Sequence, residues 1–194
     1  MSQADREKWE ARYAKKNQAS EPVDPFLEEV ADRLPSSGRA LDVAGGSGRN
    51  ALFLARRGLE STLVDISERG LELARSAAAA EGLAISTRAT DLDRDSLPSG
   101  LFDVVTCTWF LLGATHWKAI SRVLVPGGLV IYVQPTTAHS ERHAHPGHRF
   151  LVDFDELAVA VRDAGIEFLR FEQGWDAKGS HTARLLGRRT PDET

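Results

Sequence analysis

The sequence predicts an α/β protein of the doubly wound type, with a mostly parallel seven-stranded sheet, helices on both faces and an antiparallel final strand. From residue 38 onward, short apolar runs alternate with longer segments of helical periodicity, which is the pattern of a parallel sheet. A glycine-rich turn follows the first apolar run, and ligands in such folds bind beyond the carboxyl ends of the strands. The 194 residues suit one domain with a substantial core.

The individual elements follow from apolar runs and from the residues that begin or end helices. The run FDVVTCT at 102–108 is rich in β-branched residues and is typical of a buried strand. Ser67 is a favourable cap for the second helix, Gly82 ends that helix, and PGG at 126–128 ends the third. The expected strands are 39–44, 60–66, 83–89, 102–108, 129–134, 166–173 and 182–188. The expected helices are 49–57, 67–81, 115–123 and 153–164.

Composition and charge narrow the classes of function. Lysine and arginine number 24 against 28 aspartates and glutamates, and this acidic balance argues against a nucleic-acid partner. Cys107 is the single cysteine, so an intramolecular disulfide is impossible, which fits a reducing compartment. No segment has the apolar length of a membrane span, and the charged N-terminus lacks the apolar stretch of a signal peptide. We therefore expect a cytoplasmic protein with a small-molecule partner and no membrane association.

The turn after the first strand reads DVAGGSG at 42–48. Its glycines let a ligand approach bare backbone, and the amides that open the next helix favour an anion. A dinucleotide, S-adenosylmethionine and a tight turn without ligand all fit this feature taken alone. Asp42, however, would repel a diphosphate, whereas its charge suits the positive amino and sulfonium groups of S-adenosylmethionine. The turn therefore favours S-adenosylmethionine over NAD.

Two further acids follow later strands. Asp65 ends the second strand, where a carboxylate can accept hydrogen bonds from both ribose hydroxyls; the alternative is that it caps the helix beginning near Ser67. Asp91 follows the third strand and can accept from an adenine amino group, while Leu92 packs on the ring. The three acids together predict one nucleoside site at the carboxyl edge of the sheet.

In combination these residues resemble the class I S-adenosylmethionine-dependent methyltransferases, over about residues 38 to 135. The resemblance implies a Rossmann-like fold, S-adenosylmethionine as cofactor and S-adenosylhomocysteine as product. Ala44 stands where the family usually has its first glycine. The matching motifs are D-x-A-x-G-x-G at 42–48, Asp65, Asp91-Leu92, FDVV at 102–105 and L-x-PGG at 124–128.

A narrower resemblance, to the tellurite-resistance methyltransferases close to the thiopurine methyltransferases, rests on WEARY at 9–13 and GSGRN at 46–50. It implies that the N-terminal segment covers the cofactor, and Trp9 and Tyr13 share a helix face suited to this. Simple packing of an amphipathic helix is the alternative. We thus expect a single domain, 1–194, divided into an N-terminal helical cap (1–37), a cofactor-binding core (38–135) and an acceptor-side region with the final strands (136–194).

The predicted cofactor contacts gather the residues of these motifs and their neighbours. They are Trp9, Tyr13, Asp42, Ala44, Gly46, Gly48, Asn50, Asp65, Ile66, Asp91, Leu92 and Thr106.

Methyl transfer from a sulfonium is an in-line displacement, so the protein must mainly align the reactants and exclude water. A soft anionic acceptor, such as a thiolate or a tellurite-like oxyanion, needs no general base, whereas a hydroxyl or amine usually does. The alternatives are a non-catalytic S-adenosylmethionine-binding regulator, an NAD-dependent oxidoreductase and a protein or RNA methyltransferase. No Asn/Asp-Pro-Pro-Tyr/Phe motif follows the fourth strand, which disfavours amino methylation of nucleic acid.

The histidines provide the catalytic candidates, His116 and His139, without identifying a residue that must be catalytic. His139 opens a histidine-rich segment, 139–148, that is open to three interpretations: contact with the acceptor, a metal site, or a polar loop without chemistry. Neither a cysteine nor a carboxylate triad supports a metal site, so no metal is predicted.

Overall fold

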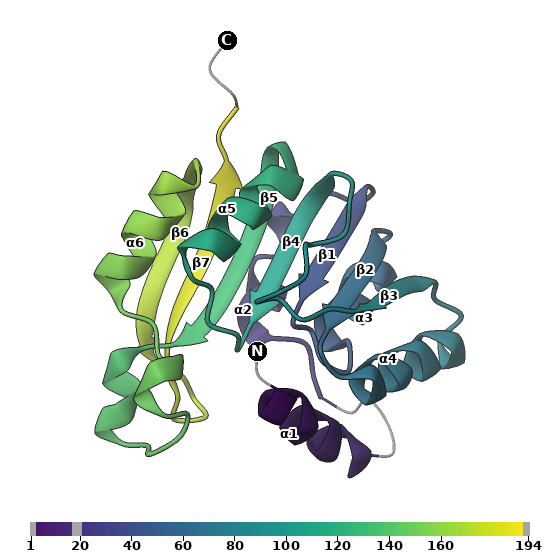
Figure 1. Ribbon diagram of the computed structural model, residues 1–194. Helices are drawn as coiled ribbons and strands as arrows, with labels where there is room; N and C mark the ends of the chain where they lie inside the picture. Colours follow the sequence, from purple (N-terminus) through teal and green to yellow (C-terminus); the bar gives the residue numbers. More distant parts are fainter. Residues whose placement is uncertain (1–2, 17–20, 192–194) are drawn as a thin grey trace.

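The computed structural model describes residues 3–16 and 21–191, which contain a seven-stranded sheet of order β3-β2-β1-β4-β5-β7-β6 (Figure 1). The pairs from β3 through to β5 are parallel, and β7 runs antiparallel to both β5 and β6. This confirms the predicted sheet and its antiparallel final strand. The strands are β1 Arg39–Val43, β2 Glu60–Asp65, β3 Ile85–Ala89, β4 Phe102–Thr108, β5 Leu124–Pro135, β6 Ile166–Trp175 and β7 His181–Arg189.

Helices cover both faces of the sheet, as predicted. Ser67 accepts a hydrogen bond from the Gly70 amide at 3.1 Å and so caps α4, while Asp153 caps α6 through the amides of Asp155 and Glu156. The α-helices are α1 Gln3–Ala14, α2 Pro25–Glu29, α3 Arg49–Arg56, α4 Glu68–Ala80, α5 Ala114–Val123 and α6 Phe154–Asp163. The short 3-10 helices are η1 Ala31–Arg33, η2 Thr137–Glu141 and η3 His148–Phe150.

The core has two main parts because successive β5 side chains point to opposite faces. Tyr132 lies under α5, where its ring meets that of Trp117 edge to face with centroids 5.1 Å apart. Ile131 points the other way, into a cluster that includes Phe26 and Leu27 of α2. This short helix has a proline at its first turn and is capped by Asp24, which accepts from the Phe26 amide at 3.1 Å.

The expectation that residues 126–128 separate the third helix from a strand beginning at 129 is wrong. β5 begins at Leu124, directly after α5, and runs through the Pro-Gly-Gly segment. Gly127 adopts a φ of +81°, and the pairing with β4 shifts register between Phe102 and Val104. An irregular strand of this kind accommodates proline and glycine, which a regular central strand would not.

Two segments flank the carboxyl edge of the parallel strands (Figure 1). α1 lies below the ends of β1 to β3 and beside α4, and the segment from η2 to η3 lies below β6 and β7. Residues 1–2 and 17–20 of the expected N-terminal cap fall outside the described residues. No helix within 3–16 and 21–191 is long and apolar enough to cross a bilayer.

Candidate cofactor and active site

The glycine-rich turn joins β1 to α3 in left-handed backbone conformations. Ala44, Gly46 and Gly48 have φ values of 54°, 59° and 84°. A Cβ atom on Gly48 would lie 2.7 Å from that of Ala74, so this glycine also lets α3 and α4 approach each other. Ala44 adopts the left-handed conformation without being glycine, and therefore carries local strain.

Asp42 lies beneath this turn, 1% exposed. Its Oδ1 accepts from the Thr106 hydroxyl at 2.8 Å, and its Oδ2 accepts from the Ala51 amide at 3.1 Å. Burial raises the pKa of this carboxyl to about 6, against the opposing effect of these hydrogen bonds. Asp42 and Thr106, both expected to contact the cofactor, are thus bonded to each other across neighbouring strands.

Asp65 connects the end of β2 to the glycine turn. Its Oδ2 accepts from the Gly46 amide at 2.8 Å, and its Oδ1 accepts from the Ser67 amide at 2.9 Å. Burial raises its pKa, opposed by these backbone donors. Because an ionised carboxylate has about four acceptor positions, two protein donors leave capacity for a ligand diol. Ile66, the next residue, is buried.

The turn after β3 holds Asp91 and Leu92 next to this region. Asp91 accepts from the Asp93 amide at 3.2 Å, and Leu92 packs into the core under α5. The Thr90 amide donates to the Asp65 carbonyl at 2.8 Å. The structure therefore brings the predicted ribose and adenine residues onto adjoining turns.

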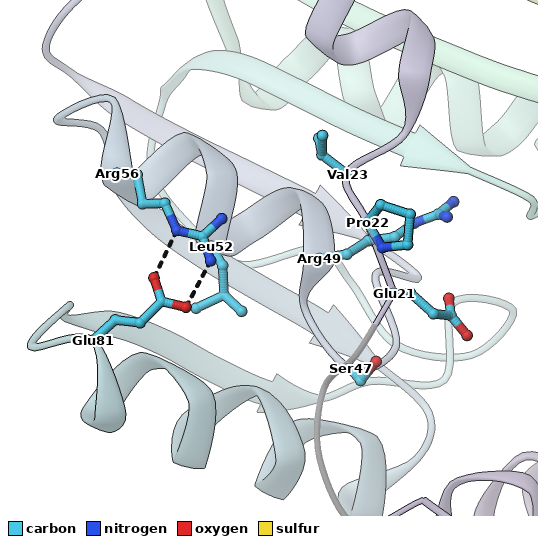
Figure 2. A pocket seen from close by; sticks show the side chains of 8 residues that line it. All are labelled: Glu21, Pro22, Val23, Ser47, Arg49, Leu52, Arg56 and Glu81. Carbon is cyan, nitrogen blue, oxygen red and sulfur yellow. Dashed lines mark hydrogen bonds and ion pairs between the residues drawn. The ribbon is translucent and has the colours of Figure 1, made fainter.

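Asn50 belongs to a buried network below the turn. Its Oδ1 accepts from the Asp24 amide at 3.0 Å, and its Nδ2 donates to the Thr108 hydroxyl at 3.1 Å. Arg49 also approaches this network, 3.3 Å from an Asp24 oxygen. Arg49 also lines a cavity of about 350 Å³, together with Ser47 and Glu21, that reaches Leu52 and Arg56 further along α3 (Figure 2).

α1 places Tyr13 beside the glycine turn, with Trp9 stacked on it. Their rings stack with centroids 6.1 Å apart, and the Tyr13 hydroxyl lies so close to Gly46 that a Cβ there would clash with it. Burial and the charge of Asp65 raise the pKa of this tyrosine. Glu10, between them in the sequence, accepts from the amides of Glu68 and Arg69 at 2.7 and 3.3 Å. Sequence reasoning missed Glu10, although it lies inside the WEARY motif.

Both catalytic candidates use both ring nitrogens within the protein. His116 accepts from the Gly113 amide through Nδ1 at 3.1 Å, and its Nε2 lies 3.1 Å from the Leu92 carbonyl. His139 is 4% exposed, accepts from the His181 amide through Nδ1 at 3.2 Å, and has Nε2 3.1 Å from the His145 carbonyl. In residues 3–16 and 21–191, no group of three histidine, cysteine or acidic side chains could hold a metal ion.

Trp109 lies directly after β4, at the carboxyl edge of the sheet. It is 43% exposed and has a φ of +63°, which is unusual for a bulky residue. Its amide donates to the Val133 carbonyl at 2.8 Å, which holds this backbone in place. Trp109 thus follows the carboxyl end of β4, at the edge of the sheet where ligands bind in such folds.

The strand order, the glycine turn and the acids are those of the Rossmann-like methyltransferase fold, whose cofactor is S-adenosylmethionine. Residues 40–128 match the family described as a methyltransferase domain. The chain is 34% identical over 167 residues to the ubiquinone/menaquinone biosynthesis C-methyltransferase UbiE of Bordetella parapertussis, covering 69% of this chain and 65% of the relative. The chain therefore spans slightly less than two thirds of that relative's length.

Two further likenesses agree with this class. The ubiquinone biosynthesis O-methyltransferase of Bordetella avium is 25% identical over 169 residues, covering 73% of this chain and 67% of the relative. The crystal structure of TehB from Haemophilus influenzae superposes with a TM-score of 0.73 at 20% identity, covering 94% of this chain and 67% of that one. The structural likeness, at this identity, establishes the fold.

Proposed function

We propose that this chain transfers a methyl group to a small-molecule acceptor by in-line displacement. The observation that carries the proposal is the hydrogen bond from the Gly46 amide to Asp65, which joins the glycine turn to the acid expected to bind ribose. Two other predicted elements adjoin this pair: Tyr13 lies against Gly46, and the turn that holds Asp91 is bonded to the Asp65 carbonyl through the Thr90 amide. The feature that fits the cofactor is the Asp65 carboxylate, which keeps acceptor capacity for the diol. Tyr13 lies over Gly46 of the turn, where it would cover a bound cofactor.

When bound, S-adenosylmethionine supplies a methyl group on a sulfonium centre: the acceptor's electron pair forms the new bond to carbon, and the sulfur keeps the electrons of the broken one. Asp65 would hold the ribose hydroxyls, and Asp91 the adenine amino group. Asp42 keeps the turn in shape through Ala51 and Thr106. Trp9 and Tyr13 would cover the site and exclude water.

For the acceptor we propose a soft nucleophile, such as a thiol or a tellurite-like oxyanion. The support is that His116 and His139 both have their ring nitrogens engaged, so neither is a free general base. A carbon or oxygen on an aromatic ring is the second candidate, favoured by the names of the C- and O-methyltransferase relatives. We also propose a cytoplasmic location, consistent with the single buried cysteine.

Calorimetric titration with S-adenosylmethionine, S-adenosylhomocysteine and NAD tests the cofactor. We expect the first two to bind and NAD not to bind, and Asp65→Ala to weaken binding while the protein stays folded. Binding of NAD alone, or unchanged affinity in folded Asp65→Ala and Asp65→Asn, would contradict the assignment. Formation of S-adenosylhomocysteine with a thiol, tellurite or phenol then separates an enzyme from a binding regulator, which would yield none.

A further inference from the structure

We propose that His116 is a positioning residue that holds the adenine-side turn, residues 90–95, against the acceptor-side loop, residues 109–113; this inference rests on the proposed function. His116 is in the first turn of α5, and its side chain is 20% exposed. It contacts both segments at once. No other role is needed to explain its two ring hydrogen bonds.

The hydrogen bonds of His116 determine which ring nitrogen carries the proton. The Gly113 amide donates to Nδ1 at 3.1 Å, so Nδ1 must be unprotonated. Nε2 then carries the hydrogen and donates to the Leu92 carbonyl at 3.1 Å, with a carboxylate oxygen of Asp93 3.5 Å away. A neutral imidazole with both nitrogens engaged is a bridge between two backbone segments rather than a base.

The adenine-side turn is held at two points. At its start the Thr90 amide donates to the carbonyl of Asp65, the residue expected to bind ribose. Two residues further on, Leu92 is held by His116 through its carbonyl and by the core through its side chain. Without His116, the polar contact that ties the outer part of this turn to α5 would be lost. The turn would then present Asp91 and Leu92 less precisely to the adenine ring.

The acceptor-side loop is also fixed to the sheet. The amides of Trp109 and Leu112 donate to the Val133 carbonyl and the Tyr132 hydroxyl at 2.8 and 3.3 Å. The ring of Phe110 meets that of His116 edge to face, with centroids 5.8 Å apart. His116 therefore sets the adenine-side turn relative to a loop that is anchored on β5, and links the two walls of the proposed site.

Two substitutions separate the two contacts of the imidazole. In His116→Asn the side-chain amide oxygen can replace Nδ1 as acceptor for Gly113, so this variant keeps the helix contact and loses Leu92. In His116→Gln the side-chain amide nitrogen can replace Nε2, so that variant keeps Leu92. We expect His116→Asn to bind S-adenosylhomocysteine and adenosine about tenfold more weakly, the effect of one lost hydrogen bond. His116→Gln should stay within about threefold of the wild type.

Calorimetry with the two ligands, together with ¹⁵N NMR of the imidazole, tests the proposal. The wild-type complex should show the hydrogen on Nε2, and Lys118→Ala, an exposed change on α5, should bind like the wild type. Wild-type affinity in His116→Asn, equal losses in both variants, or a hydrogen on Nδ1 would each overturn the inference. Failure of the wild type itself to bind S-adenosylhomocysteine would instead refute the proposed function, and is recognised without any variant.

Discussion

The Thr106 hydroxyl donates a hydrogen bond of 2.8 Å to Asp42, directly across the β1–β4 pairing. The Ala51 amide satisfies the second carboxylate oxygen. Both oxygens thus have donors, yet burial still raises the pKa of Asp42 to about 6 from its ordinary value of 3.8. The ionised carboxylate is therefore costly in the ligand-free protein, and a cationic ligand nearby would offset this cost.

We predict that Asp42 lowers the free energy of unfolding as pH rises from about 4 to about 6. In that window the folded protein keeps the Asp42 proton while the unfolded chain releases it. The stability that the protonated carboxyl provides is therefore lost as pH rises, and it does not return above pH 6. The full effect is on the order of 3 kcal/mol. Urea denaturation should find Asp42→Asn more stable, relative to wild type, at pH 7.5 than at pH 4.5.

The control for this prediction is Asp163→Asn, at an exposed position of α6. Its stability relative to the wild type should change little between the two pH values. If Asp42→Asn changed the free energy of unfolding equally at pH 4.5 and pH 7.5, Asp42 would not titrate in this window.

Ala44→Gly should stabilise the protein by about 0.5–1 kcal/mol. Ala44 has a φ of 54°, where glycine avoids the steric cost of a Cβ atom. The control is Ala79→Gly, at an exposed position in the last turn of α4, which should instead destabilise by about 0.5–1 kcal/mol. Denaturant titration measures both changes. If Ala44→Gly lost as much stability as Ala79→Gly, the backbone at Ala44 would not be strained.

Much of the fold is predictable because local pattern and burial agree. Phe102–Thr108 is observed with the predicted bounds, since a β-branched run buried along almost its whole length has no competing helical pattern. The Pro-Gly-Gly segment at 126–128 is a counter-example: its proline and glycines indicate a turn, while pairing with β4 draws them into β5. That outcome depends on a register shift between strands, which local sequence does not encode.

The site is predictable where it depends on strand ends. Asp42 and Asp65 meet at one edge because parallel strands end together there. Glu10 could not be predicted in the same way, because the amides it binds lie 58 and 59 residues along the chain. The Nε2 contact of His116 likewise depends on a turn 24 residues away, so the sequence could offer this histidine only as a catalytic candidate.

Gly46→Ala should destabilise the protein more than Gly82→Ala. Both glycines have left-handed φ values, 59° and 68°, but a Cβ on Gly46 would clash with Tyr13, while nothing lies within 4 Å of one on Gly82. The loss of stability in Gly46→Ala should exceed that in Gly82→Ala by about 1–3 kcal/mol, which is the usual cost of an overpacked site. A double-mutant cycle tests the cause: Tyr13→Ala should remove the excess at Gly46 and leave Gly82→Ala unaffected. An unchanged excess would place the clash elsewhere than at Tyr13.

Glu10→Ala should release α1 from the body of the protein. α1 has no buried residue, so its attachment depends on few contacts, and Glu10 supplies two of them at the N-terminus of α4. A carboxylate there caps free amides and interacts favourably with the helix dipole, which is worth about 1 kcal/mol. Since Tyr13 lies over Gly46, loss of α1 should weaken S-adenosylhomocysteine binding about fivefold and speed amide exchange in α1.

Glu7→Ala, exposed on the same helix, is the matched control and should change neither quantity. Equal effects of the two substitutions would show that α1 responds to charge in general rather than to the contact of Glu10 with α4.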